Sequence, residues 1–445
     1  MHKSLFKAFL ISIAFLAVAA FTAYGGGGAE SEEQVTLNYW AAPLATESQV
    51  NEVWTELVDV FAEETGVAVE FEMVPWADLQ TRLLTAMTAG GGPDVSGMGN
   101  NMSIGFSAAG GMMSLTPARL EQIGGWDRFL EADFIVGEAN KDPVSIPLTI
   151  VNGLLFYNTE MFAEVGATEI PARWDEFIDL AQGITADTDG DGTTDRWGYG
   201  LYGRPIQSWK VFLPLMFQRG VDFLDDDGRL RHNSEEGVDA LEFLTRFVSE
   251  YQISPPVAAE WNQDDMVNAF ANGVVASMIA DSGFMVRLDE SQVAESYGVA
   301  PLPYIWPGRQ DVYPDGHPAT GHVGGTNIGI LRSTEYEDEA LSFLEFVSRR
   351  DINGRINQAF SSLPPVKNAF GPEDLTPILT DALAVAENHL TPMPRVPYFQ
   401  PSLNIAAQAI QSALTLASEG PVARSELQAL LDRAVAEANA SFVTE

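Results

Sequence analysis

The residues with the clearest chemical spacing are the aspartates of an acidic loop. Carboxylates alternate around two glycines in the run Asp187-Thr188-Asp189-Gly190-Asp191-Gly192-Thr193-Thr194-Asp195, a pattern that suits an oxygen cage for Ca²⁺. Positions one, three and five are aspartates, Thr193 offers a carbonyl at position seven, and Asp195 fits position nine. The twelfth position, a bidentate glutamate in EF-hands, is Gly198. The spacing predicts a Ca²⁺ site that binds weakly or borrows a carboxylate from elsewhere, with a solvated turn as the alternative.

Composition limits the classes of partner. The chain has 445 residues, 46% of them apolar, which is enough for two sizeable cores. Its formal charge is −38, from 62 acidic and 24 basic residues, and this excess repels nucleic acid and anionic membranes. General solubility and adaptation to a saline environment explain the charge equally well. The absence of cysteine excludes disulfides, thiol catalysis and a lipoprotein anchor.

The N-terminus has the features of a secretory signal. Lys3 and Lys7 precede an apolar run over 8–21, and small residues at Ala23 and Gly25 suit a cleavage site. The run is shorter than the roughly 20 residues that span a bilayer. We therefore expect a cleaved signal peptide at 1–25 and a periplasmic protein that is not embedded in a membrane.

No catalytic motif singles out a residue. The glycines at 90–92 run into Pro93 without the Lys-Ser or Lys-Thr pair of a phosphate loop, and His317 with His322 is a weak metal signal. Glycoside hydrolysis, which needs only two suitably placed carboxylates, stays open as an alternative. We expect no enzyme, and no cofactor beyond the possible structural Ca²⁺.

Apolar periodicity predicts the elements that position these residues. A strand over 35–40 ends at Trp40, a helix follows over 50–61, and a second strand covers 67–73. This strand–helix–strand order is typical of a parallel sheet. Trp54 and Trp174 lie on apolar helical faces and are predicted to be core residues.

The segment 154–177 carries a family resemblance. It reads Leu-Leu-Phe-Tyr-Asn-Thr-Glu-Met-Phe and then, after a gap, Pro-Ala-Arg-Trp-Asp-Glu-Phe. This resembles family 1 of the extracellular solute-binding proteins of ABC importers, the carriers of sugars and oligosaccharides. The resemblance implies an α/β fold of the two-lobed periplasmic-binding-protein type (class II), each lobe a mainly parallel sheet flanked by helices and joined to the other by hinge crossovers. Lobe 1 would comprise 34–145 and 303–363, and lobe 2 would comprise 146–302 and 364–445.

The same resemblance implies a function. The protein would capture a carbohydrate by hinge closure and deliver it to the permease subunits of an ABC transporter, and we expect a monomer. A binding protein for glycerol phosphate or another non-sugar solute is the alternative.

Sugar sites combine flat aromatic surfaces with a few aimed hydrogen-bonding groups. On this chemistry and the resemblance, the predicted ligand contacts are Trp40, Trp76, Asn100, Asn101, Tyr157, Trp209, Lys210, Asp281, Phe284, Gly324, Gly325, Arg395 and Tyr398. Packing alternatives stay open: Trp40 as cover of a sheet edge, Trp76 as a staple of a helix start, and the asparagines as turn residues. Phe284 stands where the family commonly has tryptophan, so it keeps ring stacking and lacks the indole donor.

Overall fold

The computed structural model describes residues 34–44, 47–130, 134–138, 140–205, 207–221, 223–225, 229–306, 321–371, 374–388, 390–391 and 399–442. The predicted signal peptide and the predicted contacts Arg395 and Tyr398 lie outside these residues. Among the helices of this described part, none has both the length and the apolar character needed to cross a membrane.

A parallel three-stranded unit begins the first core. β1 pairs in parallel with β2 and β3, and α1 and α2 make the connections. One face of α1 buries Val50, Trp54 and Phe61, at the spacing that predicted the helix. The strand–helix–strand prediction and the core position of Trp54 are confirmed. The elements of this part are β1 (Thr36–Ala41), α1 (Glu47–Thr65), β2 (Ala68–Met73), α2 (Trp76–Ala89), β3 (Val95–Gly99), α3 (Met102–Ala109), α4 (Pro117–Gln122) and η1 (Trp126–Arg128).

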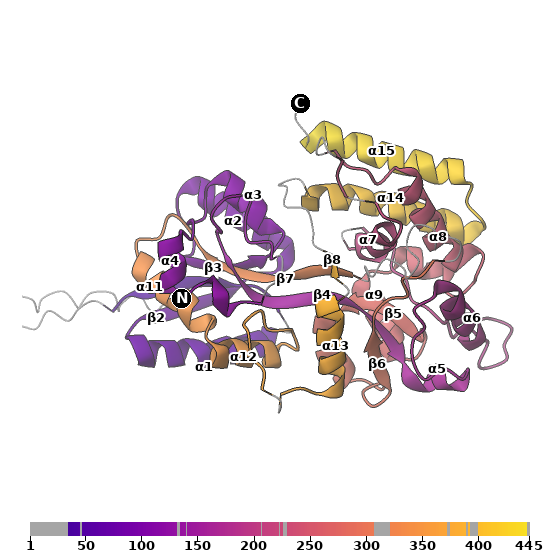
Figure 1. Cartoon of the computed structure of the whole chain (residues 1–445), viewed down its shortest axis with the longest axis horizontal. Coiled ribbons are helices and arrows are strands. Elements are labelled where there is room, and N and C mark those ends of the chain that lie inside the picture. Colours follow the sequence, from indigo (N-terminus) through magenta and orange to yellow (C-terminus); the bar gives the residue numbers. More distant parts are fainter. Residues whose placement is uncertain are drawn as a thin grey trace, which may run out of the picture. The chain divides into compact units, whose positions relative to one another are not determined.

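β4 (Ile146–Asn158) is the long strand that both parts of the structure share (Figure 1). Its first half, from Ile146 to Asn152, pairs antiparallel with β7 (Gly321–Ile330). From Gly153 onward it pairs antiparallel with β5 (Ser277–Asp281), and from Leu155 with β6 (Tyr297–Ala300). The strand order is β2-β1-β3-β7-β4-β5, with β6 beside β4 and β8 beside β7. β4 therefore leads directly from the first core into the second.

Helices supply most of the second core. Trp174 is fully buried there, as predicted. The remaining elements are α5 (Thr159–Glu164), α6 (Trp174–Ile184), α7 (Trp209–Gln218), α8 (Glu235–Ser249), η2 (Pro256–Glu260), α9 (Gln263–Ala271), η3 (Ser282–Phe284), α10 (Met285–Asp289), α11 (Glu337–Val347), α12 (Arg350–Ala359), α13 (Pro377–Asn388), β8 (Leu390–Thr391), α14 (Phe399–Glu419) and α15 (Arg424–Phe442). Of these, α11 and α12 pack in the first core.

For most buried residues, the core to which they belong changes at three places along the chain. The buried residues switch cores between Ile150 and Leu154, between Trp306 and Ile328, and between Val366 and Ala382. Each core is thus built from separate stretches of sequence. The lobe limits predicted at 145/146, 302/303 and 363/364 lie near these passages.

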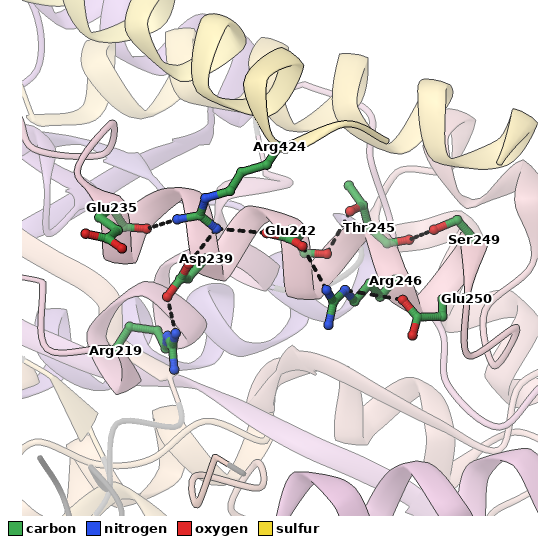
Figure 2. Close-up of polar contacts among 9 residues, drawn as sticks. All are labelled: Arg219, Glu235, Asp239, Glu242, Thr245, Arg246, Ser249, Glu250 and Arg424. Atoms are coloured by element: carbon green, nitrogen blue, oxygen red, sulfur yellow. Dashed lines mark hydrogen bonds and ion pairs between the residues drawn. The ribbon is translucent and has the colours of Figure 1, made fainter. Parts of the chain in front are cut away.

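An ionic network on α8 ties neighbouring helices together (Figure 2). Asp239 accepts from Arg219 at the end of α7 and from Arg424 at the start of α15, the latter at 2.6 Å. Arg424 also reaches Glu242 at 2.8 Å. Arg246 pairs with the same Glu242 from one turn further along α8, at 2.8 Å. Because three helices share these contacts, the network stabilises their relative positions.

Gln218 fastens the segment that leaves the second core. Its Oε1 accepts from the indole N–H of Trp174 at 2.9 Å and of Trp306 at 2.8 Å, and its Nε2 donates to the carbonyl of Pro303 at 3.0 Å. All three bonds are buried. The connection toward β7 is therefore anchored to the second core as far as Trp306.

Candidate functional site

The acidic loop brings three of its predicted ligands together. Carboxylate oxygens of Asp187, Asp189 and Asp195 lie within 4.8 Å of one another, and all three residues are exposed. The carboxylate of Asp191 is not in this group and accepts the backbone N–H of Thr193 at 2.7 Å. The chemistry of three converging carboxylates fits a hard cation such as Ca²⁺.

Hydrogen bonds keep the loop carboxylates charged. The backbone N–H of Gly192, followed by that of Gly190, lowers the pKa of Asp187. The backbone N–H and then the hydroxyl of Thr188 lower the pKa of Asp195. The twelfth position is sterically closed, because a Cβ at Gly198 would come within 2.2 Å of the carbonyl oxygen of Ala181. A glutamate cannot complete the cage from that position, and the affinity of the loop for Ca²⁺ stays a prediction.

In the first core, the structure brings the asparagine and glycine predictions together. The backbone N–H of Asn100, just after β3, donates to the carbonyl of Gly325 at 3.0 Å. The side chain of Asn100 accepts from the N–H of Asn101 at 2.7 Å, which is ordinary turn chemistry. Gly325 is glycine for a packing reason: its φ is +146°, and an added Cβ would lie 2.2 Å from the carbonyl oxygen of Thr149 on β4. Close strand pairing explains this glycine without a ligand.

For Trp40 and Trp76, the contacts in the structure agree in part with the packing roles considered as alternatives to ligand contact. The guanidinium of Arg82 lies 4.3 Å from the centroid of the Trp40 ring and is itself held by Glu72 at 2.7 Å. One face of Trp40 is therefore covered. Trp76 donates its indole N–H to the carbonyl of Pro43 at 3.1 Å, which ties the start of α2 to the loop after β1, yet 41% of the residue stays exposed. Both residues remain predictions as ligand contacts.

The second core presents a charged pair. The ammonium of Lys210, at the start of α7, lies 2.5 Å from a carboxylate oxygen of Asp281 at the end of β5. The side chains are 12% and 18% exposed, so the pair is mostly withdrawn from water. Phe284, half-buried, follows in η3. Trp209 is only 6% exposed and packs within the second core, so the structure favours a structural role for this ring over the predicted ligand contact.

β4 places the groups of both cores close together. Gly325 lies opposite Ile150, Gly324 opposite Val151, and Asp281 opposite Gly153. Three residue steps along a strand amount to about 10 Å. The Asn100 loop and the Lys210–Asp281 pair therefore lie near the same stretch of β4, where the strand changes partners.

Tyr157 does not belong to this group. It lies opposite Ser277, four residues beyond Gly153 and thus about 13 Å further along β4. Its ring packs edge-on against Phe162, with centroids 5.6 Å apart. Burial, followed by the charges of Asp381 and Glu169, raises the pKa of its hydroxyl. The structure favours a packing role for Tyr157.

Sequence reasoning missed two residues beside the charged pair. Gln263, at the start of α9, accepts from Lys210 Nζ at 3.5 Å. Tyr202 is fully buried, and its pKa is raised well above the usual value, first by burial and then by the charge of Asp281. Gln263 stands 53 positions from Lys210, and no local motif could have indicated the contact.

A shallow depression elsewhere holds none of the predicted residues. It lies between α1 and α12 and is lined by Val53, Glu56, Leu57, Arg355, Gln358 and Ala359. An ion pair between Glu56 and Arg355 accounts for its polar wall.

Comparisons with known proteins support the family resemblance. Residues 45–352 match the bacterial extracellular solute-binding protein family. The diacetylchitobiose binding protein DasA of Streptomyces coelicolor is 22% identical over 386 residues, which cover 82% of this chain and 85% of that protein. An arabinooligosaccharide-binding protein of Halalkalibacterium halodurans is 23% identical over 280 residues, covering 62% of this chain and 59% of that protein.

The fold agrees with that of a solved structure. Maltose-bound MalE3 of T. maritima superposes with a TM-score of 0.76 and 22% identity, covering 92% of this chain and all of that one. Its two-lobed α/β architecture is the fold predicted for this chain. Since the family match spans well over half of the sequence, this protein is a member of the bacterial extracellular solute-binding proteins.

Proposed function

We propose that the protein captures a neutral sugar or oligosaccharide outside the cytoplasm and delivers it to the permease of an ABC importer. In this proposal the two lobes close over the ligand, and the ligand favours the closed state because contacts from both lobes are complete only there. The relatives named above bind diacetylchitobiose and arabinooligosaccharide, and the solved neighbour holds maltose. These ligands support the sugar class for this chain.

The observation that carries the proposal is the placement of two polar groups near one short stretch of β4. Asn100 bonds to Gly325, which lies opposite Ile150 in the first core, and Lys210 pairs with Asp281, which lies opposite Gly153 in the second. A ligand with several hydroxyls can bond to both groups at once, since each hydroxyl both donates and accepts.

Charge balance at the site favours a neutral ligand over glycerol phosphate. The ammonium of Lys210 is already paired with Asp281 at 2.5 Å, so the pair has no net charge. A phosphate would need an excess of positive charge to offset its desolvation. The pair instead offers one donor group and one acceptor group to hydroxyls, which supports the sugar assignment.

A thermal-shift experiment with the purified protein tests capture. Sugars, polyols and glycerol phosphates are added singly, at a fixed calcium concentration. A ligand at about 100 times its Kd stabilises the folded state by about 2.7 kcal/mol, which is a shift of a few degrees for a chain of this size. We expect a selective shift with a neutral oligosaccharide, lost in Lys210→Met and kept in the control Lys141→Met, which removes an exposed lysine that pairs with Glu138.

Two results would redirect the assignment. A flat response to the whole panel would remove the sugar class and leave the family membership intact. Release of a cleaved product from an incubated oligosaccharide would establish the glycosidase alternative instead.

We also propose that the acidic loop binds Ca²⁺ in a structural role. The convergence of Asp187, Asp189 and Asp195 supports this, and the closed position at Gly198 points to a Kd of about 10⁻⁴ M or weaker. Calorimetric titration with CaCl₂ should give saturable heat that disappears in the double variant Asp187→Asn/Asp195→Asn. Asp338→Asn on α11 serves as a control for the loss of an exposed carboxylate outside the loop. Equal heats in all three proteins would rule out binding by the loop.

A further inference from the structure

Gln263 lies beside the charged pair in a fixed position. It is the first residue of α9 and is 3% exposed. A capping box holds the helix start. Asn262 Oδ1 accepts from the N–H of Asp265 at 2.8 Å, and Asp265 Oδ2 accepts from the N–H of Asn262 at 3.0 Å. Because the backbone on both sides of Gln263 is held, its side chain leaves the helix from a defined point.

The ammonium of Lys210 is bounded on three sides. Asp281 accepts at 2.5 Å, Gln263 Oε1 lies at 3.5 Å, and the ring centroid of Trp209 is 5.8 Å away. A lysine ammonium has three N–H donors. Acceptors among the described residues account for two of them, so a third can point to a ligand oxygen. Without Gln263, only one hydrogen bond and a distant ring would restrain a side chain with four rotatable bonds.

The surroundings of Gln263 show that packing alone does not explain this residue. Its Nε2 and the hydroxyl of Tyr202 are buried, and the described part of the chain provides no hydrogen-bond partner for either. Each such buried donor costs about 1–3 kcal/mol. A methionine would fill the volume of Gln263 without that cost. The amide oxygen, which faces Lys210, is the feature that a methionine would lack.

We propose that Gln263 is a positioning residue of the binding site, which acts by fixing the Lys210 ammonium so that its third N–H donates to the ligand. This inference rests on the proposed function, because it assigns Lys210 to ligand contact. It goes further by assigning a role to a buried residue that does not itself reach the ligand. Gln263 determines affinity through its amide oxygen only.

A pair of substitutions separates positioning from packing. Gln263→Met keeps the volume and removes the acceptor, whereas Gln263→Glu keeps an acceptor and adds a buried charge. If Gln263 positions Lys210, Gln263→Met weakens ligand binding by about tenfold and Gln263→Glu stays within about threefold of the wild type. If the role is only packing, the order is reversed: the methionine variant binds normally and the glutamate variant loses stability. That reversed order would overturn the proposal.

A double-mutant cycle tests whether the effect passes through Lys210. In the Lys210→Met background, the further change Gln263→Met should alter the Kd by less than about twofold. A full tenfold effect in that background would show that Gln263 acts independently of Lys210. This comparison still decides the question if the glutamate variant fails to fold.

An NMR measurement needs no ligand and therefore separates this inference from the proposed function. The chain holds five lysines, and the Lys210→Met spectrum of selectively ¹⁵N-lysine-labelled protein identifies the Lys210 ammonium signal. An ammonium held by protein acceptors exchanges its protons slowly and gives a visible signal. We expect that signal in the wild type and in Gln263→Glu, and its loss in Gln263→Met. Persistence in the methionine variant refutes positioning, whereas a missing ligand response in the wild type refutes only the sugar function.

Discussion

His232 is a histidine that the fold keeps neutral by burial. Its residue exposure is 1%, and its ring lies edge-on to Phe223, with ring centroids 4.7 Å apart, and to Phe212, at 6.4 Å. Its Nε2 is buried, and no residue of the described chain accepts from or donates to it. A protonated ring would lose its hydration there without compensation, so burial lowers the pKa of His232 from 6.5 to about 4.

This shift makes stability depend on pH in a definite direction. In the unfolded chain the pKa of His232 is near 6.5, so below that pH the unfolded chain binds a proton that the folded chain excludes. The free energy of unfolding therefore falls between pH 6.5 and pH 4, by up to roughly 3 kcal/mol from this residue alone. Above pH 6.5 both states are neutral and the effect is absent.

Urea unfolding of the wild type and of His232→Leu, at steps from pH 7.5 to 4.5, measures the effect. Both proteins share the titration of all other groups, so the difference between their unfolding free energies isolates His232. We expect this difference to move by about 2–3 kcal/mol in favour of leucine across the range. Phe223→Leu, a neighbour in the same core that does not titrate, should differ from the wild type by a constant amount. Parallel curves for the wild type and His232→Leu would refute the reasoning.

Three further predictions concern stability. Gln218→Leu leaves the indole N–H groups of Trp174 and Trp306 without their buried acceptor. The free energy of unfolding, measured by urea denaturation, should therefore fall by about 2–4 kcal/mol. A loss below about 1 kcal/mol would show that water replaces the amide. Gly325→Ala forces a Cβ within 2.2 Å of the carbonyl oxygen of Thr149, so the Tm should drop sharply while Gly91→Ala, in open space, changes little; equal Tm values would contradict the strand pairing. With a formal charge of −38, the Tm should rise between about 0.1 M and 1 M NaCl, as the screening length shortens from about 10 Å to 3 Å; a falling Tm would mean that ion pairs outweigh the net repulsion.

Local periodicity was enough to predict the first two strands of the first core and the helix between them. The alternation over 35–40 put Leu37 and Tyr39 on one face, and they are 0% and 1% exposed. The helical spacing that included Trp54 was equally reliable. Both patterns follow from the geometry of a single strand or helix, which the chain adopts without reference to distant residues.

Depth and partners could not be predicted in the same way. Trp209 stands at a helix start, where sequence alone does not distinguish a cleft from a core, and the structure buries it. Its neighbour Lys210 turns to Asp281, 71 positions later, and that contact depends on how α7 packs beside β5. The role of Gly325 as an opening for ligand was inferred from the family resemblance and stays a prediction. The close approach of the Thr149 carbonyl on β4, which also requires a glycine there, could not be predicted from the sequence.

The position of the charged pair along β4 gives the proposed function a structural basis. Asp281 lies opposite Gly153, the first residue at which β4 leaves β7 for β5, whereas Gly325 lies opposite Ile150, on the other side of that change. A ligand bonded to both the Asn100 loop and Lys210 would bridge the two cores across the strand that connects them. Any bending of β4 in this stretch changes the distance between the two groups, so such a ligand binds different lobe arrangements with different affinity. By linkage, a ligand can shift the equilibrium between lobe arrangements only by the difference between its binding free energies to them. The restraint of Lys210 by Gln263 increases this difference, because it keeps the donor of the second core in place.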